Sequence, residues 1–181
     1  MRHGTRDHVA PFVGSAVVMS AFAALLATPA VSAQVTDVAP APAVIVTQAE
    51  WMATMQRSAA NNTLDTKVAE TAVRGGVVRA GVIYRSRPET RALVHQELTE
   101  IYMIVEGSGT LVTGGTATES QPVSDPPNLG LTPSFFVTQV GGEVRRVGPG
   151  DIVIIPAGLP HRLSEIDGPI SYTIYRFEPT Q

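Results

Sequence analysis

The sequence lacks cysteine altogether, and it has a single lysine, Lys67, among its 181 residues. Without thiols, neither a disulfide framework nor a lipid-anchored start is possible, so the fold must be stabilised by its core alone. The formal charge is only −3, from 13 basic and 16 acidic side chains. This mild acidic excess argues against nucleic acid as a partner.

Residues 1–33 have the composition of a removable export signal. Two arginines begin it, residues 9–27 are apolar and small, and Val31-Ser32-Ala33 fits the small-residue cleavage pattern. We therefore expect a mature start at Gln34, a periplasmic or secreted location and no membrane contact after cleavage. The alternative is an uncleaved anchor, since the apolar run is about long enough to span a bilayer. Its glycine, serine and alanine content makes that span a poor one.

Removing the leader changes the histidine count and leaves room for one domain. The remaining 148 of the 181 residues suit a single folded unit, with a formal charge of −4 because two arginines and one aspartate are lost. His3 and His8 are also lost. The mature chain therefore has two histidines, His95 and His161.

Residues 34–66 are predicted to form an extended lead-in and one short helix. Thr47 to Glu50 fits a capping box, and the helix is expected to end near Ala60. We expect this helix to pack on the outside of the domain formed by residues 67–181. Its apolar side is predicted to hold Trp51, Met52 and Met55.

The domain at 67–181 has apolar residues at period two, frequent glycine turns and many β-branched residues. About ten short strands and one small helix predict an all-β sandwich or barrel. Residues 116–133 interrupt the pattern with a polar insert that contains four prolines; a lid, an oligomer contact and a surface loop are the alternatives, of which the loop is favoured. The expected strands are 68–74, 77–87, 93–95, 101–105, 110–113, 134–140, 144–147, 152–155, 161–165 and 170–177.

Gly150 to His161, GDIVIIPAGLPH, is predicted to be a β-hairpin that presents one histidine. Ile152 to Ile155 suits a buried strand, and Pro156-Ala157-Gly158 suits a tight turn. Pro160 excludes a helix and places His161 at the start of the next strand. A histidine held this rigidly is either packed in the core or used in chemistry.

Val94 to Gly109, VHQELTEIYMIVEGSG, contains the second group of polar candidates. A hairpin here would bring His95 and Glu100 together across its mouth, with Tyr102 on the same face as Glu100. With His161 added, two imidazoles and one carboxylate suit a divalent transition metal with open coordination positions.

These two stretches resemble the motifs of the cupin superfamily. The second cupin motif, G-x5-P-x-G-x2-H-x3-N, matches at Gly150, Pro156, Gly158 and His161, with Glu165 where asparagine is usual. The first motif, G-x5-H-x-H-x3/4-E-x6-G, matches at the residues that would be its second histidine, its glutamate and its final glycine. Leu93 occupies the position of its first histidine. The residues that match the first motif are His95, Glu100 and Gly107.

The resemblance implies a double-stranded β-helix barrel, often a homodimer, with a divalent metal held inside by His95, Glu100 and His161. Iron, manganese, nickel, zinc and copper all suit such a donor set. Cupins include metal-dependent oxygenases, isomerases and lyases. If this protein is one of these enzymes, its expected substrate is a small polar organic molecule. Cupins also include non-catalytic small-ligand binding or sensing proteins and metal-free structural barrels, so the fold alone does not select a function.

Each candidate residue also has a structural interpretation. His161 can be a hydrogen-bonded core histidine, and His95 with Glu100 can be a plain polar pair in a barrel that has lost its metal. The positions of the two histidines at two ligand sites favour the metal, since a facial triad needs only three ligands. Tyr102 is a candidate proton donor or substrate contact, with filling of the barrel as its alternative.

The remaining polar candidates are expected to be mainly on the surface. Glu97 is predicted to be a solvated turn residue rather than a ligand. Arg79, Arg85 and Arg87 share one strand face, and an outward row of charges is favoured over an interior arginine that pairs with a carboxylate substrate. A barrel plugged by Leu93, Tyr102, Phe135 and Phe136 would favour the inert interpretation, whereas an open polar pocket would favour an enzyme.

Overall fold

The computed structural model describes residues 41–123 and 133–180. Backbone contacts separate Met1–Asp37 from a unit that spans Val38–Gln181, and every described residue belongs to the second. The predicted export signal at 1–33 lies outside the described residues. Within the described ranges, no helix combines the length and the apolar content that crossing a membrane requires.

Helix α1, Gln48–Asn61, begins at the predicted capping box. Glu50 N–H donates to Thr47 Oγ1 at 3.3 Å, and Thr47 N–H donates to Glu50 Oε2 at 2.7 Å. Met55 is buried and Trp51 partly buried, as predicted, whereas Met52 is 39% exposed and does not belong to the buried side. The buried positions are Thr54, Met55 and Ser58.

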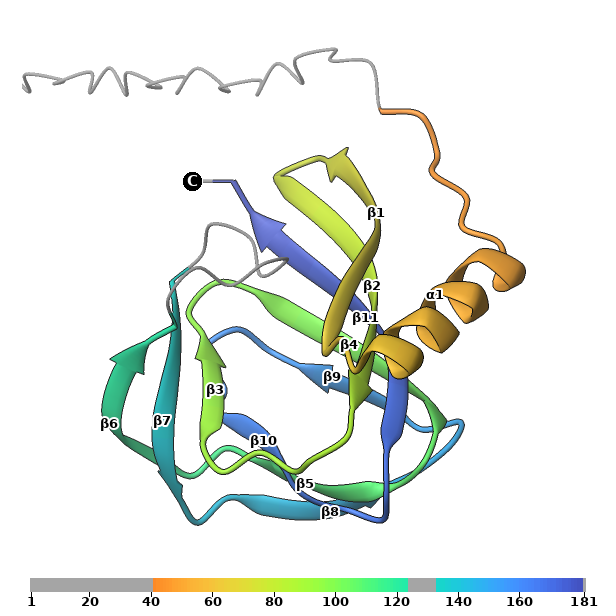
Figure 1. Cartoon of the computed structure of the whole chain (residues 1–181). Coiled ribbons are helices and arrows are strands. Elements are labelled where there is room, and N and C mark those ends of the chain that lie inside the picture. Colours follow the sequence, from red (N-terminus) through yellow and green to blue (C-terminus); the bar gives the residue numbers. More distant parts are fainter. Residues whose placement is uncertain (1–40, 124–132, 181) are drawn as a thin grey trace, which may run out of the picture. The chain divides into compact units, whose positions relative to one another are not determined.

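The strands form two antiparallel sheets that enclose one core, which confirms the predicted all-β barrel (Figure 1). The five-stranded sheet has the order β1-β2-β11-β4-β9, with β1 Asp65–Val73, β2 Gly76–Arg85, β4 Thr99–Glu106, β9 Ile152–Ile155 and β11 Ile170–Pro179. The six-stranded sheet has the order β6-β7-β3-β10-β5-β8, with β3 Ala92–His95, β5 Gly109–Thr113, β6 Thr116–Pro122, β7 Ser134–Val140, β8 Glu143–Val147 and β10 His161–Ile166.

The inner faces of the two sheets supply the core at period two. In β4, residues 100, 102 and 104 are buried while residues 101, 103 and 105 between them are only partly so. Tyr102 and Ile104 pack with Tyr172 of the same sheet and with Leu111 and Leu163 of the other sheet. The core therefore fills the space between the sheets.

Both segments predicted as β-hairpins are instead corners that connect the two sheets. Strand β9 pairs with β4 in the five-stranded sheet, whereas β10 pairs with β3 and β5 in the six-stranded sheet. Strands β3 and β4 are separated in the same way. Turn residues and apolar alternation show where a strand ends, but they carry no information on which sheet receives the next strand.

Part of the polar insert is a strand, so the loop prediction was wrong for residues 116–122. Strand β6 pairs antiparallel with β7, from Thr116 opposite Val140 to Pro122 opposite Phe135, and every residue of β6 is exposed. A fully exposed strand at the edge of a sheet shows no apolar alternation, which is why the sequence pattern did not reveal it. Residues 124–132 of the insert lie outside the described part of the chain.

Candidate functional site

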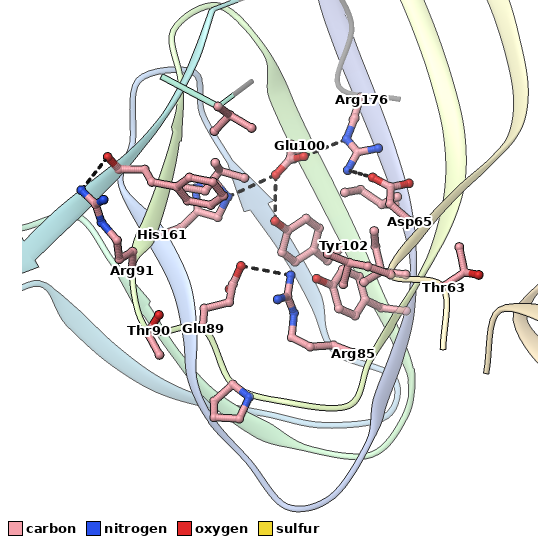
Figure 2. A pocket seen from close by; sticks show the side chains of 18 residues that line it. Thr63, Asp65, Arg85, Glu89, Thr90, Arg91, Glu100, Tyr102, His161 and Arg176 are labelled. Carbon is pink, nitrogen blue, oxygen red and sulfur yellow. Dashed lines mark hydrogen bonds and ion pairs between the residues drawn. The ribbon is translucent and has the colours of Figure 1, made fainter. Parts of the chain in front are cut away.

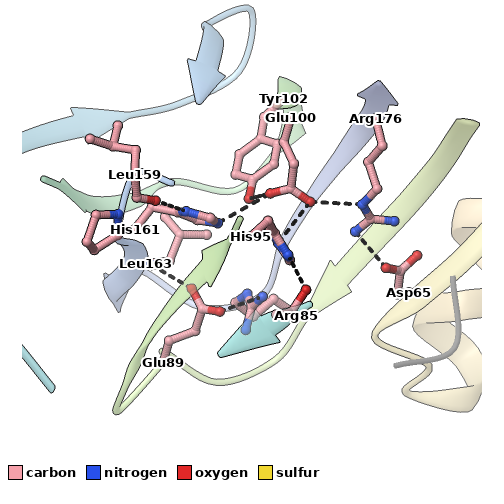
Figure 3. A network of polar contacts seen from close by, with 12 residues as sticks. Asp65, Arg85, Glu89, His95, Glu100, Tyr102, Leu159, His161, Leu163 and Arg176 are labelled. Carbon is pink, nitrogen blue, oxygen red and sulfur yellow. Dashed lines mark hydrogen bonds and ion pairs between the residues drawn. The ribbon is translucent and has the colours of Figure 1, made fainter. Parts of the chain in front are cut away.

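Three side chains from different strands converge inside the barrel (Figure 3). His95 is the last residue of β3 and His161 the first residue of β10, so both lie in the six-stranded sheet. Glu100 faces them from β4 in the opposite sheet. One ligand atom from each lies within 4.8 Å of the others, and the three residues are 1–3% exposed. The barrel thus brings together all three predicted ligands.

The corner before β10 ties the two histidines together. Gly158 has a φ of +79°, a left-handed conformation that favours glycine. In this conformation the Gly158 N–H donates to the carbonyl oxygen of His95 at 2.6 Å. The glycine of the second motif therefore links the end of β3 to the turn that delivers His161.

The two imidazoles are oriented through their Nδ1 atoms. His161 Nδ1 donates to the Leu159 carbonyl oxygen at 2.9 Å, and His95 Nδ1 lies 2.7 Å from Ser134 Oγ. The Nε2 atoms of both rings are buried and have no hydrogen-bond partner among the described residues. Burial alone would lower the pKa of His161, but the contact with Glu100 raises it, so a metal would have to displace a proton from this ring. With Nδ1 anchored in this way, the deprotonated Nε2 is free to ligate, the arrangement found at metal-ligating histidines.

Glu100 completes the donor set as a carboxylate. His95 Nε2 lies 3.5 Å from its Oε1, and His161 Nε2 lies 3.3 Å from its Oε2. Burial alone would raise the pKa of Glu100, but the two imidazoles and the Arg176 guanidinium hold it well below its usual range. Two nitrogen donors and one anionic oxygen, all buried and aimed at one point, fit a divalent transition metal.

Arg176 holds Glu100 from the side opposite the histidines. Its Nε donates to Glu100 Oε1 at 2.8 Å, and its Nη2 donates to Asp65 Oδ2 at 2.7 Å (Figure 3). Burial alone would lower the pKa of Arg176, but the two carboxylates more than offset this, so the guanidinium stays charged. Arg176 therefore fixes the orientation of Glu100 and partly neutralises its negative charge.

Tyr102 also binds Glu100. Its hydroxyl donates to Glu100 Oε2 at 2.7 Å, and its ring lies 4.7 Å from that of Tyr172. Burial and the neighbouring carboxylate raise the pKa of Tyr102 well above its usual value. The phenol is therefore a donor whose proton is directed at Glu100, and its predicted catalytic role stays a prediction.

Leu93 stands where the first histidine of the motif would be. It pairs with His161 in the β3–β10 ladder and lies two residues from His95 on the same strand face. Its side chain lines the pocket described next. An apolar side chain here leaves three candidate metal ligands, His95, Glu100 and His161.

A pocket of about 650 Å³ opens beside this cluster (Figure 2). Its volume is in the range of small-molecule sites. Most of its lining is apolar, and Glu100, Tyr102 and His161 are among the lining residues. Of the side chains expected to plug the barrel, Leu93, Tyr102 and Phe136 line the pocket instead of filling it, and Phe135 is absent from the lining.

Arg85 contradicts the prediction of an outward row of arginines. It lines the pocket and pairs through Nη2 with Glu89 Oε1 at 3.0 Å (Figure 2). Glu89 in turn accepts from the Leu163 N–H at 2.7 Å. Arg87 lies past the end of β2 and is exposed. Glu97 is also exposed, in agreement with the turn position expected for it.

Several residues of the site had no sequence signal. Arg176, Asp65 and Ser134 each reach the cluster from strands that are distant in sequence. Arg176 lies opposite Glu100 in the β11–β4 ladder, although the two residues are 76 positions apart. Only the strand pairing places these residues together.

Comparisons with known proteins agree with this architecture. Residues 137–181 match the family profile of the AraC-like ligand binding domain, which covers β7 to β11 and includes His161. The match covers about a quarter of the chain. The two antiparallel sheets, with the motif residues between them, have the cupin fold. None of the curated proteins compared with the chain matches it.

The solved structures that resemble this chain do so at low identity. DMSP lyase DddQ from Ruegeria pomeroyi is 22% identical with a TM-score of 0.35, over 57% of this chain and 39% of DddQ. BH2720 from Bacillus halodurans is 17% identical with a TM-score of 0.45, over 81% of this chain and 89% of that one. Pac13 of Streptomyces, a nucleoside dehydratase, is 10% identical with a TM-score of 0.39, over 65% and 78%. The chain spans about two fifths of DddQ, and none of the three likenesses transfers an activity to it.

Proposed function

We propose that this cupin binds one divalent metal through His95 Nε2, the Glu100 carboxylate and His161 Nε2, and acts on a small polar organic molecule in the adjoining pocket. One observation carries the proposal. Two buried imidazole nitrogens without hydrogen-bond partners converge with an ionised carboxylate at the end of an open pocket. Each nitrogen lies 3.3–3.5 Å from a Glu100 oxygen without a hydrogen bond of good geometry, and a metal bound between the three groups would satisfy all of them.

The donor set suits iron, manganese, nickel, zinc or copper, and supply in the cell selects among them. A bound metal of this kind would supply Lewis-acid or oxygen-activating chemistry, which covers the oxygenase, isomerase and lyase classes. The residues of the chain itself perform the remaining tasks. Arg176 and Tyr102 hold Glu100 in place, Leu93 leaves a coordination position free, and the apolar walls exclude water from the bound molecule.

Metal content measured by plasma mass spectrometry tests the proposal. Near one metal per chain is expected for the wild type, with loss in His161→Ala and in Glu100→Ala. Glu97→Ala is the matched control, because this glutamate is exposed and lies three residues from Glu100. Absence of metal from the wild type, even after incubation with excess divalent ions, would overturn the proposal.

A second candidate is a binding or sensing module without turnover. The match to an AraC-like ligand binding domain over residues 137–181 favours it. Release of a tightly held organic molecule when the protein unfolds, together with no consumption of that molecule by the metal-loaded protein, would support this candidate. Consumption of the molecule would support the enzyme.

Export and self-association complete the proposal. The leader-like composition of residues 1–33 supports a periplasmic or secreted protein, and N-terminal sequencing of the exported chain would give Gln34 as its first residue. The homodimer is an expectation from the cupin resemblance, and sedimentation of the mature protein tests it.

A further inference from the structure

We infer that the pocket recognises small organic carboxylates, with Arg91 as the residue that pairs with the carboxylate group. The inference rests on the proposed function in taking this pocket as the ligand site. It does not depend on a bound metal. Its basis is the distribution of charge around the pocket wall.

Arg91 lies between β2 and β3, is half-buried and lines the pocket (Figure 2). Its Nη1 donates to the Gln121 side-chain oxygen, and its Nη2 donates to the backbone carbonyl oxygens of Glu119 and Phe136, the latter at 3.1 Å. All three acceptors are neutral. They hold the guanidinium in place on β6 and β7 without neutralising its charge.

The other arginines of the pocket wall are neutralised. Arg85 pairs with Glu89 at 3.0 Å, and Arg176 pairs with both Glu100 and Asp65. Among the described residues that line the pocket, Arg91 is the cation that forms no ion pair. A partly buried guanidinium without a counter-ion is a strong site for a charge-assisted hydrogen bond to a carboxylate.

The candidate metal cluster acquires the same preference when a metal binds. Asp65, Glu100 and Arg176 sum to −1, so a divalent ion held by His95, Glu100 and His161 brings their net charge to +1. The loaded pocket then carries excess positive charge both at this cluster and at Arg91. Neutral or cationic molecules gain nothing from this field, whereas an anion gains at either end.

The wall beside Arg91 suits the hydrocarbon part of such a ligand. Leu93 and Phe136 are paired across the β3–β7 ladder, and both line the pocket. Leu93 is also the neighbour of His161 in the β3–β10 ladder. A molecule with its carboxylate at Arg91 would lie along these two side chains and extend toward the candidate metal centre.

Isothermal titration calorimetry with matched acids and amides tests the inference. Hexanoate and benzoate are compared with hexanamide and benzamide at constant ionic strength, on metal-loaded and on chelator-treated protein. The wild type is expected to bind each carboxylate at least about tenfold more tightly than its amide. Arg91→Gln is expected to abolish this preference, and Arg91→Lys to keep most of it.

Arg87→Gln is the matched control, because Arg87 is exposed, lies in the same connection and does not line the pocket. Its carboxylate preference should equal that of the wild type. Equal affinity for acid and amide in the wild type, an equal loss in Arg91→Gln and Arg87→Gln, or no binding of either acid would overturn the inference. If Arg91→Gln fails to fold, the wild-type preference and Arg91→Lys still decide it.

The two proposals fail in different ways. A chain that takes up no metal but selects carboxylates through Arg91 refutes the metal centre and supports the anion site. A chain that holds metal at His95, Glu100 and His161 but binds acids and amides equally supports the metal centre and refutes the anion site.

Discussion

Two clusters in the five-stranded sheet each join one arginine to two carboxylates, and they differ in their surroundings. Arg79 pairs with Glu70 and Glu178, and the side chains of Arg79 and Glu70 are 14% and 41% exposed. Arg176 pairs with Asp65 and Glu100, and the side chains of Arg176 and Glu100 are 6% and 2% exposed. We call these the outer and the inner cluster.

The outer cluster is complete as an ion-pair network, whereas the inner cluster is not. Glu100 also faces two imidazole Nε2 atoms that have no hydrogen-bond partner, and it lies at the end of a pocket. In the outer cluster only Glu70 is open to screening by water, because the side chains of Arg79 and Glu178 are 14% and 10% exposed. Burial and unsatisfied ligand atoms, rather than charge pairing, distinguish a candidate site from structural support.

The largest difference is expected from removal of each arginine in the metal-free protein. Arg176→Gln leaves a buried carboxylate without its cation and should reduce the free energy of unfolding by about 3–5 kcal/mol. Arg79→Gln should cost less, about 2 kcal/mol, because one of its two partners, Glu70, is 41% exposed while Glu178 is buried. Urea denaturation of chelator-treated protein measures both, and equal losses would remove the distinction between the clusters.

Removal of one carboxylate from each cluster should separate them by metal affinity. Glu100→Gln removes an anionic ligand and is expected to weaken metal binding by about 100-fold or more. Glu178→Gln should leave it unchanged, since Glu178 pairs with Arg79 in the outer cluster. Competition with a chromophoric chelator measures the affinities. Equal affinities in the two variants would place the metal elsewhere.

Leu93→His should raise the metal affinity of the inner cluster by adding a fourth ligand. Leu93 faces His161 across the ladder, so an imidazole there is expected to tighten metal binding by about tenfold, which is about 1.4 kcal/mol. Leu93→Ala is the size-reducing control and should not tighten it. A weaker site in Leu93→His would show that position 93 does not face the metal.

The smallest effect is expected from the support of His95. Ser134→Ala removes the hydrogen-bond partner of His95 Nδ1 and should weaken metal binding about fivefold, the value of one neutral hydrogen bond. Ser164→Ala removes a hydroxyl that donates to the Thr110 carbonyl oxygen at 3.2 Å and should have no effect on the metal. The same chelator competition compares the two, and a reversed order would contradict the assigned role of Ser134.

The candidate ligands could be predicted from the sequence because the motifs that position them are short. Pro156 and Gly158 form the turn that delivers His161, and His95 precedes Glu100 by five residues in one connected segment. The prediction that these segments are β-hairpins was wrong, since both connections pass from one sheet to the other. The ligands still meet, because the inner faces of the two sheets point at the same core.

By itself, the sequence determined the strand-rich architecture, the helix cap and the identity of three convergent donors, since each depends on side-chain types within a few residues. Only the tertiary structure decided which groups surround those donors. Arg176 reaches Glu100 across 76 residues and Asp65 across 111, and Arg91 meets a neutral acceptor 45 residues away in Phe136. Such partners are set by strand order and register, which local patterns do not encode. The charge of the pocket follows from that register.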